Sequence, residues 1–208
     1  VEYGTTKQVT HTPEAERGLS FGADNRSLVY SSERNGKRDL YIAKISRKED
    51  LNFPNATLIE EEPLIHDKKL ERDYPQFSPD GKEVAFIEDR NRLMVVNLDT
   101  KKIRQVTDGS TWYTRSGGFD YSWSPDGKWF TLEFIGNKHD PYSDIGLVSA
   151  DGKGQIINLT NSGYTSGSPR WVMGGNAILF ITERYGMRNH ASWGSLNDVM
   201  IAFLNQDA

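Results

Sequence analysis

The sequence contains no cysteine and few histidines, and each shortage removes a class of site. Without cysteine, the 208-residue chain can form neither disulfides nor thiolate metal sites. Its four histidines, His11, His66, His139 and His190, lie far apart and lack the short spacing of zinc ligands. We therefore predict no metal site and no cofactor.

Long apolar runs and blocks of like charge are also missing. No run approaches the roughly 20 apolar residues that span a bilayer, and residues 1–4 do not begin a signal peptide. The 29 acidic and 25 basic residues are interspersed, with a formal net charge of -4. This pattern excludes membrane insertion and does not favour nucleic acid as a partner. If the parent protein is exported, its signal peptide has been removed.

No catalytic constellation is evident in the sequence. The strand-turn-helix frame that carries a nucleophile in Gly-x-Ser-x-Gly is missing. Ser192 and Ser195 flank Trp193 near His190, and we interpret this segment as a polar loop between two strands. We predict no catalytic residue in the chain, and whether the whole protein is an enzyme stays open.

What the sequence does contain is an internal repeat. The hexapeptide Phe-Ser-Pro-Asp-Gly-Lys at 77–82 returns as Trp-Ser-Pro-Asp-Gly-Lys at 123–128, with weaker copies at 21–26 and 171–176. This recurrence matches the period of about 40 to 50 residues that is typical of β-propeller blades. We expect the leading aromatics, Phe21, Phe77, Trp123 and Trp171, to fill the core between blades.

The chemistry of the hexapeptide predicts a tight turn between two strands. Proline presets a type I turn, aspartate can bond neighbouring amides, and Gly81 or Gly127 accepts the left-handed conformation that closes a hairpin. In the first copy Asn25 replaces glycine and tolerates the same conformation. In the fourth copy Met173 replaces proline and Gly174 replaces aspartate, which predicts a turn of another type.

Segments after each turn have the composition and spacing of strands. Alternating apolar residues predict half-buried second strands at 28–30, 84–86, 130–132 and 178–180, followed by third strands at 39–43, 93–97, 144–148 and 198–202. Fourth strands are expected at 103–107, 156–160 and, less clearly, 56–59. The fold prediction is all-β, a β-propeller of about four four-stranded antiparallel blades. The predicted blades span residues 17–60, 72–108, 118–161 and 167–205.

The two ends of the chain complement each other. Lys7-Gln8-Val9-Thr10 matches the fourth-strand pattern of Arg104-Gln105-Val106-Thr107, so residues 1–11 are expected to be the last strand of a preceding blade. The fourth blade, in turn, lacks its own last strand. Either the first strand closes a small four-bladed ring, or the chain is part of a larger propeller of the six-bladed type. We favour the larger ring.

This repeat resembles those of TolB-type propellers over nearly the whole chain. The segment from His190 to Ala208 is similar to the N-terminal propeller of bacterial tricorn-like serine peptidases. That resemblance implies a non-catalytic propeller region that binds or gates peptides for a protease core outside this chain. The alternatives are a TolB-like protein-binding adaptor of the cell envelope and the propeller of a prolyl-oligopeptidase-like enzyme. The implied partners are peptides or proteins and the remaining domains of the parent polypeptide, and the implied location is the periplasm, with the cytoplasm as the alternative.

One feature in the residues themselves points to a binding surface. In a propeller, the loops after second and fourth strands emerge on one face, and here they are rich in aromatics and arginine, including Arg34 and Arg38 in the first blade. Such residues often anchor interfaces. The alternative is that these loops pack against each other or against a neighbouring domain. The predicted binding residues are Trp112, Tyr113, Arg115, Tyr142, Arg184, Tyr185, Arg188, His190 and Trp193.

Overall fold

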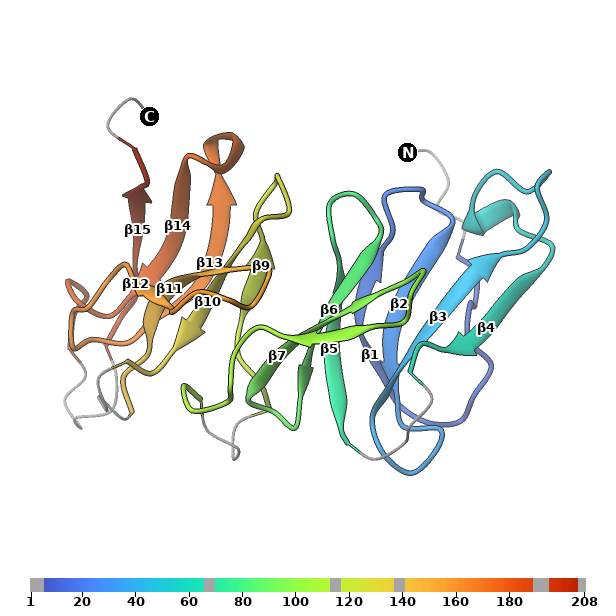
Figure 1. Cartoon of the computed structure of the whole chain (residues 1–208), viewed down its shortest axis with the longest axis horizontal. Coiled ribbons are helices and arrows are strands. Elements are labelled where there is room, and N and C mark those ends of the chain that lie inside the picture. The colour runs from blue at the N-terminus through green and yellow to red at the C-terminus, as the bar shows by residue number, and fades with distance from the viewer. Residues whose placement is uncertain (1–5, 66–69, 113–116, 137–140, 189–194, 206–208) are drawn as a thin grey trace. The chain divides into compact units, whose positions relative to one another are not determined.

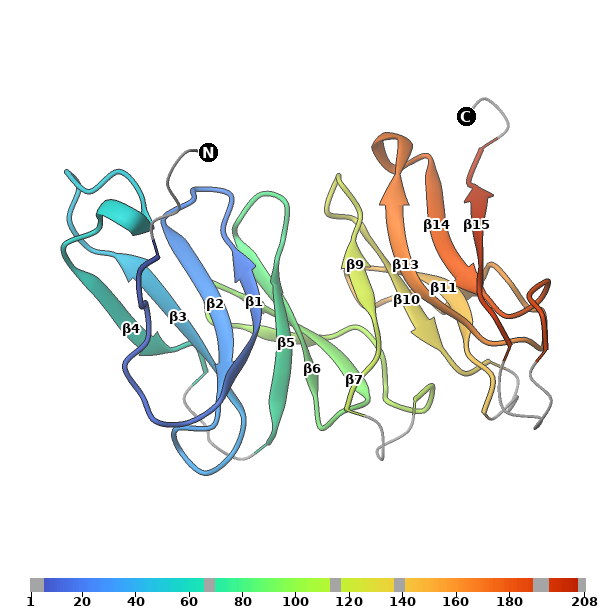
Figure 2. The same cartoon turned by 180° about the vertical axis from the view of Figure 1, so that it is seen from behind.

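The structure of the chain is a computed structural model, which describes residues 6–65, 70–112, 117–136, 141–188 and 195–205. The described residues form strands, joined by turns and two three-residue 3-10 helices (Figures 1 and 2). This confirms the all-β prediction. The chain divides into two compact units, Val1–Ile103 and Arg104–Ala208, which are described separately below. Within the described part of the chain, no helix is long and apolar enough to cross a bilayer.

The first unit carries two antiparallel sheets in which consecutive strands pair, in the orders β1-β2-β3-β4 and β5-β6-β7-β8. The first sheet consists of β1 (Glu16–Phe21), β2 (Ser27–Ser32), β3 (Asp39–Ile45) and β4 (Ile59–Pro63). The second consists of β5 (Arg72–Phe77), β6 (Glu83–Glu88), β7 (Arg92–Asn97) and β8 (Ile103–Gln105), whose first residue ends the unit.

The second unit repeats this plan with one four-stranded and one three-stranded sheet. The four-stranded sheet consists of β9 (Tyr121–Trp123), β10 (Trp129–Phe134), β11 (Asp144–Ser149) and β12 (Ile157–Asn158). The three-stranded sheet consists of β13 (Ser166–Val172), β14 (Ala177–Thr182) and β15 (Asp198–Phe203). On β15, at the edge of this sheet, the side chains of Val199, Ile201 and Phe203 are exposed.

The repeated hexapeptide forms the turn between the first two strands of a sheet, as predicted. Gly81 and Gly127 both have φ near +70°, and Asn25 has φ +52°. Two hydrogen bonds account for the serine of the motif. The Ser124 hydroxyl donates to Asp126 Oδ1 at 2.6 Å and accepts from the Trp129 amide at 2.9 Å. These bonds tie the turn to the start of the next strand. The turn at 173–176 instead contains the 3-10 helix Met173–Gly175.

The second strands of the first unit are more deeply buried than the predicted half-buried strands, whereas β14 (Ala177–Thr182) keeps the predicted alternation at 178–180. Residues 28–32 of β2 and 84–88 of β6 are buried without alternation, because neighbouring sheets of the unit pack face to face. The core between these two sheets contains Val29, Leu40 and Phe86. In the second unit, Ile145 of β11 and Ile178 of β14 belong to the corresponding core.

Two expectations for the first sheet were wrong. Residues 56–58 are not a strand, because Asn52 caps a 3-10 helix at Phe53–Asn55 just before them and the Asp50 carboxylate accepts from the amide and hydroxyl of Thr57. β4 starts at Ile59. Phe21 does not fill a core between sheets: it is 56% exposed and packs edge-on against Phe53 at 5.4 Å.

Residues 6–12 form no strand in the structure. Val9 packs against the apolar cluster on the first sheet, and Lys7 donates a hydrogen bond to the carbonyl of Ala56. This segment therefore lies against the first sheet, and its assignment to a preceding blade stays a prediction.

The first strand of three sheets contains a bulge. Each bulge has one residue with positive φ, at Gly18, Tyr74 and Ser168. In the second unit, the bulge turns the Ser168 amide toward the neighbouring sheet, where it donates to Glu133 Oε1 at 2.7 Å. This bulge thus creates a polar contact between β13 and β10 of adjacent sheets.

Candidate functional site

The connection between β14 and β15 is a long loop that doubles back on itself. We call residues 183–197 the hairpin loop. The Leu196 amide donates to the Met187 carbonyl at 3.0 Å, and Arg188 and Ser195 form an isolated β-bridge. Gly186 is required here, since a Cβ at this position would lie 1.5 Å from the Leu196 carbonyl oxygen. The two described arms of the loop are therefore paired with each other, and residues 189–194 lie outside the described part.

This loop presents arginines stacked on tyrosines. The Arg184 guanidinium carbon lies 5.2 Å from the centroid of the Tyr185 ring, and that of Arg188 lies 5.4 Å from the centroid of Tyr164. Arg188 Nη2 also donates to the Tyr164 hydroxyl at 3.1 Å. Tyr185 and Met187 are 62% and 76% exposed. We call these five residues, Tyr164, Arg184, Tyr185, Met187 and Arg188, the hairpin-loop site.

Such a set of side chains suits the recognition of a peptide. Guanidinium groups donate to carbonyl and carboxylate oxygens, while the tyrosine rings and the methionine thioether offer apolar contact area. Stacking limits the rotamers of both arginines, so less side-chain entropy is lost on binding. Tyr164 lies on the connection between β12 and β13, and its pairing with Arg188 could not be read from the repeat.

Of the remaining predicted binding residues, the structure describes Tyr142 and Trp112. Tyr142 is 45% exposed. It lies between β10 and β11, the second and third strands of their sheet, just as the hairpin loop joins the second and third strands β14 and β15. The half-buried Trp112 ring packs against Phe119, with centroids 5.7 Å apart, so it has a packing role. Four other predicted binding residues lie outside the described residues: Tyr113, Arg115, His190 and Trp193. Their assignment to a binding surface stays a prediction.

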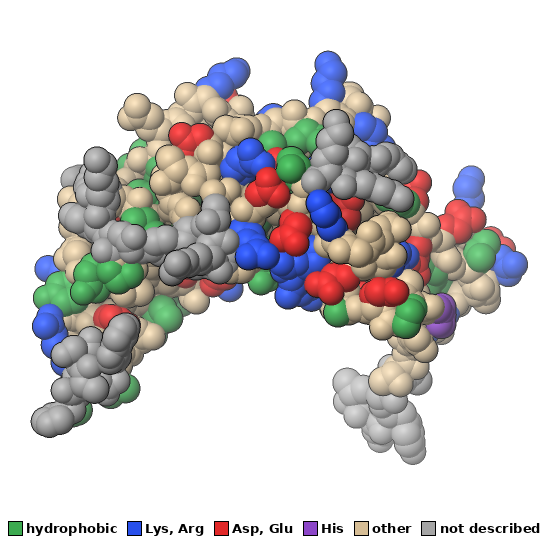
Figure 3. Space-filling view, turned by 90° about the horizontal axis from the view of Figure 1, so that it is seen from below, with side chains coloured by type: hydrophobic (Ala, Val, Ile, Leu, Met, Phe, Trp, Pro, Cys, Tyr) green, Lys and Arg blue, Asp and Glu red, His purple; other side chains and the backbone are tan. Residues whose placement is uncertain are grey.

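Charges on the surface are mixed. In the view of Figure 3, basic and acidic side chains lie beside one another and hydrophobic side chains also reach the surface. This matches the interspersed charges of the sequence.

In the first unit, Arg34 is held by its own sheet. Its guanidinium group forms ion pairs with Glu16 at 2.9 Å and Glu61 at 2.8 Å and lies 4.1 Å from the centroid of Tyr41. The hydroxyl of Tyr30 donates to the same Glu61 at 2.5 Å. Burial, followed by the hydrogen bond to Glu61, raises the pKa of Tyr30 above its ordinary value.

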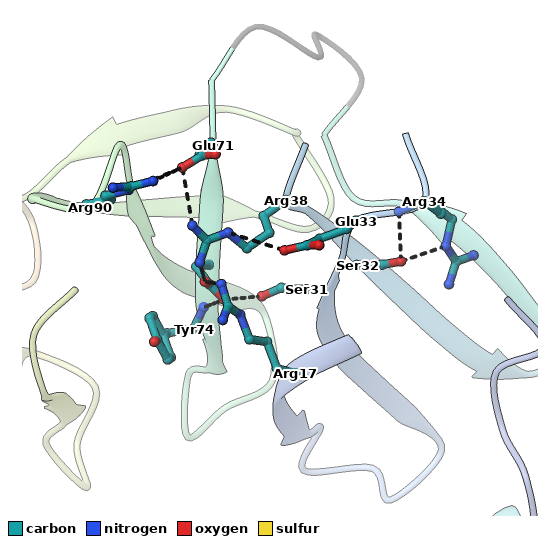
Figure 4. A network of polar contacts seen from close by, with 10 residues as sticks. Arg17, Ser31, Ser32, Glu33, Arg34, Arg38, Glu71, Tyr74 and Arg90 are labelled. Atoms are coloured by element: carbon teal, nitrogen blue, oxygen red, sulfur yellow. Dashed lines mark hydrogen bonds and ion pairs between the residues drawn. The ribbon is translucent and has the colours of Figure 1, made fainter. Parts of the chain in front are cut away.

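Arg38 likewise forms ion pairs within the first unit (Figure 4). It pairs with Asp73 at 2.7 Å and Glu71 at 3.4 Å, and Asp73 also accepts from Arg17 at 2.9 Å and from the Ser31 hydroxyl at 2.7 Å. The network joins the two sheets of the first unit. The first-blade arginines that were expected among the binding loops thus stabilise the fold.

The described residues contain no assembled nucleophile and base. The Ser195 hydroxyl donates to the Glu183 carbonyl at 2.8 Å, while Ser192 and His190 lie outside the described residues. The letters Gly-x-Ser-x-Gly do occur at 18–22, but the segment runs through β1, and Ser20 Oγ accepts from the Phe77 amide at 3.1 Å. Among the described residues, no group of three His, Asp or Glu side chains can hold a metal ion.

The sequence of the chain is similar to those of known propeller proteins. No protein-family model matches the chain. The Tol-Pal system protein TolB of Francisella tularensis subsp. tularensis is 24% identical over 153 residues, which cover 70% of this chain and 31% of that protein. The chain thus spans about a third of the length of the curated relatives it first matches.

Several solved β-propeller structures share the fold of this chain. TolB from Acinetobacter baumannii matches with a TM-score of 0.65 at 21% identity, covering 95% of this chain and 43% of that chain. The tricorn protease matches with a TM-score of 0.64 at 14% identity, covering 95% and 18%. The β-propeller domain of the Trilobed protease from Pyrococcus furiosus matches with a TM-score of 0.54 at 14% identity, covering 90% and 54%.

The chain has the fold of β-propeller blades and is similar to those of TolB and of the tricorn protease. Its four sheets are blades 1 to 4 in chain order. The hairpin loop therefore belongs to blade 4, and it joins the second and third strands of that blade. The number of blades in the complete ring stays a prediction.

Proposed function

We propose that this chain is a non-catalytic propeller region that binds peptide segments through the hairpin-loop site. In this proposal the parent polypeptide is a tricorn-like peptidase whose protease core lies in other residues. The observation that carries it is the stacking of Arg184 on Tyr185 and of Arg188 on Tyr164 beside the exposed Met187.

The exposed apolar side chains of the hairpin-loop site carry a cost in water. Tyr185 and Met187 leave large apolar surfaces in water, and exposed apolar groups that gather with arginine are typical of interface anchors. A bound peptide would cover these side chains while its carbonyl oxygens accept from the guanidinium groups. Peptide binding therefore accounts for both the exposed apolar surface and the ordered arginines.

A TolB-like adaptor is the second candidate, because the relative from Francisella tularensis is a Tol-Pal system protein. In that case the hairpin-loop site would bind a folded protein partner rather than peptide substrates.

A prolyl-oligopeptidase-like parent is the third candidate, supported by a TM-score of 0.60 to a prolyl endopeptidase at 16% identity. The sequence of the parent beyond Ala208 separates the three. We expect a PDZ-like segment and a serine-protease core for the first, a stop soon after the last blade for the second, and an α/β-hydrolase domain for the third.

The periplasm is the location that we propose, following the resemblance to TolB-type and bacterial tricorn-like proteins. Fractionation of cells that express the parent protein tests it. Recovery of the parent with periplasmic markers supports the proposal, and recovery with cytosolic markers removes it.

The test of the proposed function combines a peptidase assay with a binding assay. The purified chain should release no product from a fluorogenic peptide library yet bind members of that library by fluorescence polarisation. Ser195→Ala should leave the assay at the same background. Turnover that disappears in Ser195→Ala would contradict a non-catalytic role.

A further inference from the structure

The turn of blade 4 differs in sequence from the other three turns, and a pocket lies beside it. Where blade 3 has Pro125 and Asp126, blade 4 has Met173 and Gly174, and Gly175 follows. A Cβ built on Gly174 would meet no atom within 4 Å. Beside this turn, residues of blades 3 and 4 line a pocket of about 570 Å³, within the usual range of roughly 300 to 1,000 Å³ for ligand sites.

The largest side chains that line this pocket are apolar, and polar groups line the rest of it. Trp129, Leu147 and Ile157 come from blade 3 and Trp171 comes from blade 4. The Trp171 indole donates to the Ser122 carbonyl at 3.1 Å, so its polar atom is already bonded. Trp129 and Ile157 are 37% and 52% exposed, so a ligand in the pocket would remove large apolar groups from water.

One carboxylate lines this pocket. Asp126 is the charged group among its described lining residues. Hydrogen bonds from the Ser124 hydroxyl and then the Lys128 amide hold the pKa of Asp126 below its ordinary value, so the side chain is ionised at neutral pH. Lys128 Nζ is 3.9 Å from Asp126 Oδ2 and its side chain is 77% exposed, so this pair is weak and screened by water.

The other polar side chains of the pocket already have partners. Asn176 donates to the Met173 carbonyl at 3.0 Å and accepts from Asn205 at 2.9 Å. Ser124 bonds to Asp126 and to the Trp129 amide. A ligand is therefore recognised by apolar burial and by the negative charge of Asp126. An indole face also attracts a cation, which favours the same charge on the ligand.

We propose that this pocket binds an aromatic side chain of a peptide or protein partner, with a neighbouring lysine or arginine of that partner beside Asp126. The site shares no residue with the hairpin-loop site and lies at the turn end of blades 3 and 4, whereas the hairpin loop leaves the opposite end of the strands. It is therefore a second binding site, and it does not depend on the proposed function.

The direct test follows the indole N–H signals of the ¹⁵N-labelled chain by NMR. The probes are three capped dipeptides, acetyl-Phe-Lys-amide, acetyl-Phe-Glu-amide and acetyl-Ser-Lys-amide. We expect acetyl-Phe-Lys-amide to shift the signals of Trp129 and Trp171 saturably. Acetyl-Phe-Glu-amide should bind at least about threefold more weakly, and acetyl-Ser-Lys-amide should cause no saturable shift. Absence of saturation with acetyl-Phe-Lys-amide, or equal binding of the Lys and Glu probes, would overturn the proposal.

A matched pair of variants isolates the charge. Asp126→Asn keeps the Oδ1 acceptor of the turn and should lower the affinity for acetyl-Phe-Lys-amide at least threefold. Asp80 occupies the same place in blade 2, where Oδ1 accepts from the Ser78 hydroxyl at 2.6 Å and no residue of this pocket is present. Asp80→Asn should leave the affinity unchanged. Equal losses in the two variants would show that the turn rather than the pocket charge is responsible.

The aromatic wall is tested separately. Trp129→Ala should abolish saturable binding of acetyl-Phe-Lys-amide, while Tyr185→Ala at the hairpin-loop site should leave it unchanged. Backbone amide spectra report whether Trp129→Ala remains folded, and the Trp171 indole still reports binding. Should that variant not fold, Ile157→Ser supplies the same test without adding charge, because Ile157 is exposed at the edge of the pocket. Full affinity in a folded variant of either kind would overturn the proposal.

Discussion

The guanidinium group of Arg188 lies over the ring of Tyr164 and donates a 3.1 Å hydrogen bond from Nη2 to the Tyr164 hydroxyl. This contact joins the hairpin loop to the connection between blades 3 and 4. Both side chains are accessible to solvent, so we expect a modest coupling of about 0.5 to 1 kcal/mol. A double-mutant cycle of Tyr164→Leu and Arg188→Ala, measured by urea unfolding, should give this value.

A control cycle shows whether that coupling is specific. Tyr164→Leu combined with Lys128→Ala should be additive, because Lys128 lies at the turn end of blade 3. If the Tyr164 and Arg188 changes are additive as well, the two loops are energetically independent and the preformed arrangement of the hairpin-loop site is refuted.

Gly127→Ala should lower the free energy of unfolding by about 1 kcal/mol, because φ is +70° at this position and alanine is strained there. Gly154→Ala is the matched control: its Cβ would lie 3.6 Å from the Ser149 Cβ, an ordinary contact. We expect the control to change stability by less than about 0.5 kcal/mol. Thermal or urea unfolding of both variants measures the difference, and equal stabilities would contradict the assigned turn conformation.

The repeated hexapeptide predicted much of the fold because its chemistry is local. Proline, aspartate and glycine specify a turn within six residues, so the positions of Gly81 and Gly127 in their turns follow from the residue order alone. Most of the strand at 59–63 escaped prediction because its residues, Ile-Glu-Glu-Glu-Pro, lack an apolar pattern, whereas residues 56–58, expected to be a strand, are bound through the Thr57 amide to the Asp50 carboxylate.

Spatial relationships within the candidate sites were harder to predict. Arg34 and Arg38 are of a residue type that often anchors interfaces. Their ion pairs with Glu61 and Asp73, however, depend on strands that are distant in sequence. The pocket beside Trp129 was also missed, because it requires two blades to meet. The replacement of Ser-Pro-Asp by Val-Met-Gly in the fourth repeat was the available signal for it.

Glu133 should make stability depend on pH. Burial, followed by the nearby Asp120 carboxylate, raises the pKa of Glu133, although the Ser168 amide bonds to its ionised form and Arg170 opposes the shift. The folded state then binds a proton more readily than the unfolded state. The stabilising effect is complete below the unfolded pKa, about 4.3, and is lost as pH rises through the folded pKa.

Glu133→Gln removes this titration and keeps an acceptor for the Ser168 amide. The free energy of unfolding of the variant minus that of the wild type should therefore increase as pH rises from about 4 toward neutrality. Urea unfolding at a series of pH values measures it. A difference that stays constant or falls over this range would contradict the raised pKa.

The central claim, that the hairpin-loop site binds peptides, is tested most directly by titrating library peptides into the wild-type chain and into Tyr185→Ala and Arg184→Ala. Lys153→Ala serves as a control, because this side chain is 85% exposed on the β11–β12 turn of blade 3. We predict that each hairpin-loop variant loses about 1 to 2 kcal/mol of binding free energy, roughly a 5- to 30-fold rise in Kd, with unchanged thermal stability. The control should bind like the wild type. Wild-type affinity in both hairpin-loop variants would contradict the account and show that these loops serve to pack against another domain.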